Sequence, residues 1–290
     1  MKIFYNNEKE LRSIWKVIFV FIIFNMMTLI SVIAAGLIYQ NFHIKSFTDM
    51  ISDTMNHDLG YSLAIIIMSG LFYLFYQYIV KREHLTWADL GFTREQRFLS
   101  IIQGFGLGVI FVAAYLSVLI VMGQVEFTFR PLTGDVMGSL LYGIVIFSGV
   151  AFAEEITFRG YFQNLLGKQS RLAGLILTAI LFALNHLLNT GIYTIASLVY
   201  LTIGGVLFGV IRLGMNNIWF PIGFHIAWNW TEIRVFGLEN SSAHHWMSTK
   251  IIENTIWNGG GSGSGLIIIF AELVLIIAFG FLYKRNKAML

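Results

Sequence analysis

Three stretches of this sequence place ionisable or amide side chains inside strongly apolar segments. Carboxylates and imidazoles are among the side chains that most often move protons in catalysis. A charged side chain at the centre of a bilayer costs about 2.5–3.5 kcal/mol or more, so these residues are the first candidates for a function. The three stretches are Glu154-Glu155 followed by Arg159, Phe182 followed by His186, and His225 followed by Asn229.

The four-residue spacing within these stretches places both members of a pair on one face of a helix. Glu155 and Arg159 are predicted to form an ion pair, which stabilises the guanidinium in a low-dielectric site and keeps Glu155 ionised. Glu154 is rotated by about 100° from Glu155 around the helix, so it is free for another role. His225 and Asn229 are expected to project together from one face.

The composition indicates what kind of protein must hold these residues. Of the 290 residues, 57% are hydrophobic and 12% are charged, and the mean hydropathy is +0.72. So few charges cannot cover a water-soluble surface, which excludes a cytosolic enzyme, a disordered chain and a DNA-binding domain. The chain has no cysteine, so disulfides and thiolate metal sites are excluded as well. The sequence predicts a polytopic membrane protein.

A transmembrane helix needs about 20 mostly apolar residues. On this criterion we predict an all-α fold, a bundle of about eight transmembrane helices in a single membrane domain over residues 1–290. The predicted spans are Ile14–Tyr39, Tyr61–Val80, Phe98–Met122, Met137–Leu166, Leu172–Leu188, Ile192–Ile211, Ile218–Val235 and Leu266–Tyr283.

The distribution of basic residues predicts the orientation of these helices. With eight spans, 14 lysines and arginines flank the helices on the side of both termini, and four lie on the other side. Because basic residues concentrate in cytoplasmic loops, both termini are expected in the cytoplasm of a cell-membrane protein.

The polar residues of the three stretches are predicted to lie at similar depths. At a rise of 1.5 Å per residue from the cytoplasmic helix ends, Glu154 and His186 each lie about 21 Å deep. His225 lies about 12 Å deep and Asn229 about 18 Å deep. A single buried Glu–Arg pair or a single histidine is often structural. Several such side chains at similar depths in the membrane favour a functional site.

The three stretches together resemble the motifs of the CPBP family, the CAAX protease and bacteriocin-processing group, also known as abortive-infection or type II CAAX prenyl endopeptidase-like proteins. Each motif alone is weak, whereas all three in order on separate membrane helices are specific. Gly205-x-x-x-Gly209 and Pro221 are also similar to the family pattern. The resemblance covers about residues 137–229, which would be the catalytic core.

The resemblance implies an intramembrane peptidase of the glutamate type. In that reading Glu154 and His186 hold and deprotonate a water molecule that attacks the peptide carbonyl. His225 and Asn229 donate hydrogen bonds to the oxyanion of the tetrahedral intermediate. General-base catalysis and oxyanion stabilisation are the two forms of assistance that this reaction needs.

The same resemblance gives Glu155 and Arg159 the role of orienting the groups that touch the substrate. Metal-independent catalysis without a cofactor is the favoured reading, and a zinc-dependent version remains an alternative. Two histidines and a glutamate are the three protein ligands of many catalytic zinc sites. Against zinc, the chain has no H-E-x-x-H pair, and Asn229 suits an oxyanion donor better than a zinc ligand.

The expected partners are a peptide or protein C-terminal tail as substrate and the membrane lipids, and no nucleic acid is expected. Eukaryotic relatives act on prenylated C-termini, and bacterial relatives are linked to bacteriocin immunity or peptide processing. The main alternative is a non-catalytic membrane scaffold or immunity protein that binds a partner through the same fold. A transporter is a weaker alternative, because the charges gather in one pocket and do not form a chain across the membrane.

Overall fold

The computed structural model of the protein describes residues 12–39, 46, 49–51, 54, 58–186, 195–238, 245–258 and 265–288. Residues 187–194, which include the ends of two predicted spans, lie outside the described residues. The described helices are α1 (Ser13–Tyr39), α3 (Asp58–Arg82), α4 (Arg97–Val121), α5 (Gly134–Glu155), η1 (Ile156–Phe162), α6 (Gln163–Gly167), α7 (Arg171–Asn185), α8 (Ile195–Met215), α9 (Trp219–Trp230), η3 (Thr231–Val235) and α10 (Leu266–Ala288). The segments η1 and η3 are π-helices.

Each of the eight predicted spans coincides with a helical segment. Six helices are long and apolar enough to cross a membrane, as expected for a multi-pass membrane protein. They are α1, α3, α4, the continuous helix from α5 through η1 to α6, α8 and α10. The other two predicted spans correspond to α7, with 15 residues, and to α9 with its continuation η3. The all-α bundle is therefore confirmed, whereas the count of eight crossings stays a prediction.

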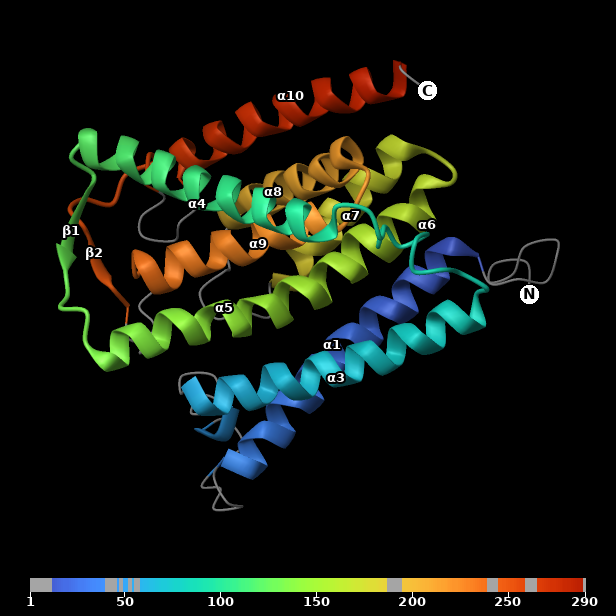
Figure 1. Ribbon diagram of the computed structural model, residues 1–290, viewed down its shortest axis with the longest axis horizontal. Helices are drawn as coiled ribbons and strands as arrows, with labels where there is room; N and C mark the ends of the chain where they lie inside the picture. Colours follow the sequence, from blue (N-terminus) through green and yellow to red (C-terminus); the bar gives the residue numbers. More distant parts are fainter. Residues whose placement is uncertain are drawn as a thin grey trace.

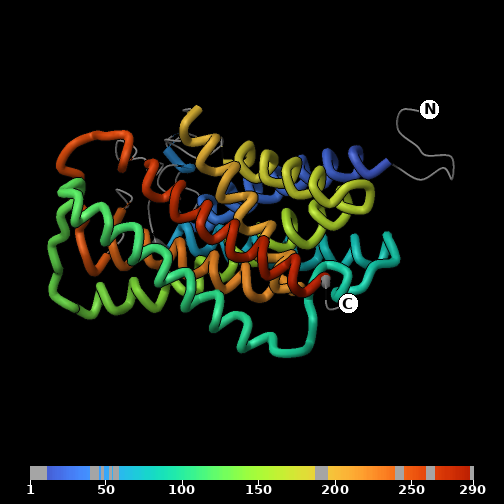
Figure 2. Tube along the Cα trace, turned by 90° about the horizontal axis from the view of Figure 1, so that it is seen from above, coloured from blue at the N-terminus to red at the C-terminus, as the bar shows by residue number. Residues whose placement is uncertain are grey.

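The helices run back and forth between two ends of the molecule (Figure 1). α1 begins and α10 finishes at the same end, to the right in Figure 1, and the tube seen from above shows the same arrangement (Figure 2). The opposite end carries a two-stranded antiparallel sheet of β1 (Val125–Phe129) and β2 (Met247–Ile251). We call it the sheet end. These short strands were not among the predicted elements.

Local sequence explains where the central helices begin. The side chain of Thr133 accepts a hydrogen bond from the backbone of Val136 and caps α5, and Ser170 caps α7 in the same way through Ala173. From Gly134 the helix continues without a break for 34 residues to Gly167, but its backbone hydrogen bonds change from the α-helical to the π-helical pattern at Ile156. A π-helical turn of this kind is frequent at functional sites.

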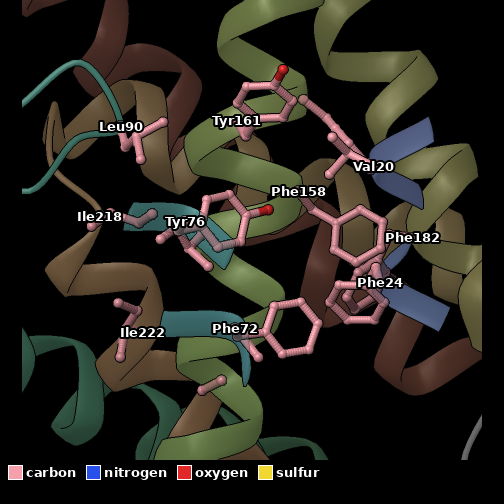
Figure 3. Packing of buried hydrophobic residues seen from close by; sticks show 14 of the residues in the cluster. Val20, Phe24, Phe72, Tyr76, Leu90, Phe158, Tyr161, Phe182, Ile218 and Ile222 are labelled. Carbon is pink, nitrogen blue, oxygen red and sulfur yellow. The ribbon is translucent and has the colours of Figure 1, made fainter. Parts of the chain in front are cut away.

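Two hydrophobic cores meet at α9. The first joins α1, α3 and the α5–η1–α6 helix, and Figure 3 shows Phe72, Tyr76 and Phe158 in it. The second joins α4, α8, α9 and α10. Ile218 and Ile222 of α9 belong to the first core, and other α9 residues, such as Phe224, belong to the second. α9 is therefore packed on several sides, which places its polar side chains in the protein interior.

Glycines allow α4 and α9 to approach closely, as small residues do between membrane helices. A Cβ atom added at Gly104 would lie 2.1 Å from the carbonyl oxygen of Phe220, and one added at Gly223 would lie 2.2 Å from that of Ile101. Both contacts are with backbone, so only a movement of a helix could relieve them.

We therefore expect Gly104→Ala to destabilise the protein, because overpacking typically costs about 1–3 kcal/mol. Gly106 on the same helix is a matched control, since a Cβ atom there would meet nothing within 4 Å. Alanine at that position should be neutral or stabilising, because it has the higher helix propensity. Thermal unfolding of both variants in one detergent checks this expectation, and equal midpoints would contradict it.

Candidate active site

The predicted site residues come from three helices. Glu154 and Glu155 are the last two residues of α5, and Arg159 lies in the π-helix η1 that follows them. His225 lies in the middle of α9. These four side chains form one cluster, and the structure places its centre on the carboxylate of Glu155.

The Glu155 carboxylate contacts two side chains at once, those of Arg159 and His225. Nη1 of Arg159 donates to Oε1 of Glu155 at 3.0 Å, which confirms the predicted ion pair. Nδ1 of His225 lies 2.9 Å from the same oxygen, a contact that the sequence did not predict. Glu155 is 0% exposed and Arg159 is 1% exposed. The pair therefore sits in a low-dielectric interior, where breaking it is costly.

Glu154 faces the other nitrogen of the same imidazole. Its Oε2 lies 3.7 Å from Nε2 of His225, and this oxygen is buried without a hydrogen-bond partner. The Glu154 side chain retains 13% exposure, unlike that of Glu155. The imidazole of His225 thus lies between two carboxylates, of which one is fully engaged and the other has an oxygen available for a substrate or a water molecule.

The guanidinium of Arg159 is held by aromatic rings and a helix backbone. Its Cζ atom lies 4.3 Å from the ring centroid of Phe182 and 4.8 Å from that of Phe208, distances typical of cation–π contacts. Nη2 donates to the carbonyl oxygen of Gly205 at 3.3 Å. One turn further, Gln163 donates to the carbonyl oxygen of Gly209 at 3.1 Å. These contacts fix the position of Arg159 and, through it, of Glu155.

The glycines of α8 make room for these contacts. A Cβ atom at Gly205 would lie 2.8 Å from Cα of Ala179 in α7, and one at Gly209 would lie 3.0 Å from Oε1 of Gln163. The Gly205-x-x-x-Gly209 spacing therefore serves close packing of α8 against α7 and against the helix that carries Arg159.

His186 lies at the C-terminal end of α7, beside this cluster. Its Nδ1 lies 2.9 Å from the carbonyl oxygen of Phe182, and its ring centroid lies 4.6 Å from that of Phe182. The Phe182 ring in turn lies 6.4 Å from that of His225. Among the described residues, no hydrogen bond joins His186 to Glu154, the residue with which it was expected to share a water molecule.

Asn229 lies one turn after His225 on α9 and is half-buried. Within the described part of the chain, its amide makes no hydrogen bond. Asn229 lies on the same helix as His225, and the projection of the two side chains from one face stays a prediction.

The described residues do not form a three-ligand metal centre. No group of three or more His, Cys, Asp or Glu side chains in the described ranges is arranged to hold a metal ion. Glu154 and His225 are two potential metal ligands that lie close together. However, Nδ1 of His225 is already engaged with Glu155. The donor set as it stands does not fit a catalytic zinc site with three protein ligands.

Sequence reasoning missed the neighbours that orient the cluster. Phe208 lies 4.8 Å, ring to ring, from His225, and Gln163 follows Arg159 by one turn. Gln163 could have been found, because a buried amide four residues after a buried arginine shares its helix face. Nothing in the sequence distinguished Phe208 as a neighbour of the site, since aromatic residues are frequent throughout this apolar sequence.

Comparisons with known proteins test the family assignment. Comparison with curated proteins gave no match, and neither did comparison with solved structures. Residues 136–231 match the model of the Rce1-like family, described as "Type II CAAX prenyl endopeptidase Rce1-like". This segment runs from the start of α5 through η1 and α7 to the end of α9, so it contains all three motifs. The segment 136–231 thus matches the family that the motifs resemble.

Proposed function

We propose that the protein is an intramembrane endopeptidase that hydrolyses a peptide bond in a peptide or protein C-terminal tail. The observation that carries this proposal is the arrangement of Glu154 and Glu155 around the imidazole of His225 in a segment that matches a peptidase family. One carboxylate is locked by Arg159, and the other has a buried oxygen without a partner. Such an asymmetric pair suits one positioning group and one general base.

In the proposed reaction Glu154 accepts a proton from a water molecule whose oxygen attacks the peptide carbonyl carbon. The carbonyl oxygen becomes the oxyanion of a tetrahedral intermediate. When this intermediate collapses, the C–N bond breaks, and the proton held by Glu154 passes to the leaving amine. The products are an amine and a carboxylic acid, which releases its proton at neutral pH, and no cofactor is consumed. His186 is proposed to hold the water together with Glu154.

His225 and Asn229 are proposed to stabilise the oxyanion. Because a carboxylate only accepts hydrogen bonds, Nδ1 of His225 donates to Glu155, and donation from Nε2 as well requires the imidazolium form.

The proposed location is the cell membrane, with both termini in the cytoplasm and the site open to the cytoplasmic side. Basic residues on the side of the termini support this orientation. It gives a cytoplasmic C-terminal tail a direct path to the site. The family match supports a prenylated tail as one substrate class, and an unmodified peptide is the other.

Cleavage of peptides by the purified full-length protein tests the proposal. The protein in detergent is incubated with a mixed peptide library that includes prenylated tails, and the products are read by mass spectrometry. We expect fragments that accumulate with time and with protein concentration. Absence of any product, from a protein that is folded by thermal unfolding, would support the membrane scaffold instead.

We further propose that catalysis is independent of metal ions, because Nδ1 of His225 is already engaged with Glu155. A chelator such as EDTA or 1,10-phenanthroline should therefore leave the cleavage rate unchanged. Loss of activity in chelator, with recovery on addition of zinc, would contradict the proposal and favour the metalloprotease. A soluble zinc protease treated in parallel confirms that the chelator is effective.

A further inference from the structure

A second group of polar side chains lies in the bundle interior, outside the site described above. It consists of Glu272 of α10, Glu232 of η3, Tyr115 of α4 and Tyr200 of α8. Glu232 lies seven residues, or about 10 Å, nearer the sheet end than His225 along the α9–η3 helix. Both carboxylates lie beyond the segment 136–231 that matches the peptidase family.

Glu272 is the most unusual member of this group. It is 0% exposed, and both of its carboxylate oxygens are buried without a hydrogen-bond partner. No lysine, arginine or histidine among the described residues forms an ion pair with it. A buried carboxylate without a partner is strongly unfavourable. The charge must therefore be neutralised, either by a bound cation or by a proton.

The surroundings of Glu272 leave room for that carboxylate between two helices. α10 packs along α8, and a Cβ atom added at Gly204 of α8 would lie 3.0 Å from Oε1 of Glu272. A larger residue than glycine would displace the carboxylate from its place. The structure thus holds the charge of α10 against the backbone of α8.

The other side chains supply further oxygen atoms and a second negative charge. Glu232 is close enough for its charge to act on Glu272, and both carboxylates act on Tyr115. The hydroxyl of Tyr115 donates to Oε1 of Glu232 at 2.5 Å. Tyr200 is near enough to Tyr115 for the two hydroxyl groups to interact electrostatically. All the side-chain donors of the group are oxygens, which suit magnesium, calcium or manganese rather than zinc.

We propose that Glu272 and Glu232 bind a hydrated divalent cation of the magnesium or calcium class. Two carboxylates match the charge of such an ion, and magnesium in particular is commonly held by one or two carboxylates with several waters. Glu232 is half-buried, and Glu272 is the seventh residue of α10, so both carboxylates lie in the part of the bundle nearer the sheet end. A bound ion would tie α10 to α8 and to η3.

Thermal unfolding of the full-length protein in detergent tests this site without relying on peptidase activity. After treatment with a chelator, the wild-type midpoint should rise saturably with MgCl2 or CaCl2, and should not rise with NaCl or KCl at equal ionic strength. Glu272→Gln should abolish this rise. Glu126→Gln, which removes an exposed carboxylate from β1 at the same end, should retain it. Metal analysis after desalting should find divalent ion on the wild type and much less on Glu272→Gln.

Loss of the response through misfolding can be distinguished from loss of the site. In chelator, Glu272→Gln should unfold at the wild-type temperature or above, because it removes an unpaired buried charge, and Glu232→Gln should weaken the response in the same way. The proposal is wrong if divalent ions do not raise the wild-type midpoint, or raise it equally in Glu272→Gln. It is also wrong if acidification alone gives the full stabilisation and metal adds nothing, since Glu272 would then hold a proton.

Discussion

Glu154→Gln should lower the rate of peptide hydrolysis by about 10²–10⁴-fold, the usual contribution of a general base. The amide has the shape of the carboxylate but cannot accept the proton of the attacking water. Little structural change is expected, because Oε2 of Glu154 makes no hydrogen bond and the ion pair of Glu155 with Arg159 does not involve it. Initial rates with one peptide substrate, measured at equal protein concentration, check this prediction.

Glu126→Gln is the matched control for this variant. It makes the same chemical change at an exposed position on β1, so its cleavage rate should equal that of the wild type. Both variants should unfold at the wild-type temperature. Wild-type cleavage by Glu154→Gln would remove Glu154 from the role of base, and a large fall in its unfolding temperature would show that the residue is structural.

Arg159→Ala should destabilise the protein by about 3–5 kcal/mol, because it leaves the carboxylate of Glu155 buried without its cation. The loss has three parts in the structure. Arg159 donates to Glu155 at 3.0 Å and to Gly205 at 3.3 Å, and it contacts the rings of Phe182 and Phe208. Denaturant titration in mixed micelles measures the change in the free energy of unfolding.

A double variant separates the ion pair from the packing. Glu155→Gln with Arg159→Met removes both charges and restores much of the volume, so it should recover part of the stability that Arg159→Ala loses. It should nevertheless remain inactive in peptide cleavage, because His225 then loses the carboxylate that orients its Nδ1. Equal stability of Arg159→Ala and the wild type would show that the pair contributes little to the fold.

The sequence predicted most of the helices, because an apolar run of membrane length has few alternatives to a helix. It also predicted the Glu155–Arg159 pair from the spacing of the two residues. The start of η1 at Ile156 could not be predicted, since nothing in the local sequence distinguishes a π turn from an α turn. The strands β1 and β2 were also missed, because their pairing joins segments more than 100 residues apart.

Contacts between helices were the least predictable part of the site. Depth along each helix indicated that Glu154, His186 and His225 lie near one another, but not which nitrogen meets which oxygen. The structure brings Glu154 and Glu155 to the two sides of His225, whereas His186 contacts Phe182. Rotation of a helix about its axis decides such contacts, and in an apolar sequence the periodicity that would reveal it is weak.

Glu272 was not among the predicted functional residues. It is an ionisable residue inside the predicted span Leu266–Tyr283, where a charge is costly, but it belongs to none of the three motifs. Its complete burial and its two oxygens without hydrogen-bond partners make it a candidate functional residue.

Hydrolysis in ¹⁸O-labelled water tests whether Glu154 activates a water molecule for attack on the peptide bond. The wild-type protein is allowed one turnover of a cleaved peptide, and both the product and the fragment of the protein that contains Glu154 are weighed by mass spectrometry. We predict one ¹⁸O atom in the new carboxylate of the product and none in Glu154. Label in the Glu154 side chain would reveal a covalent acyl intermediate, and an unlabelled product would exclude hydrolysis by water, so either result would contradict this mechanism.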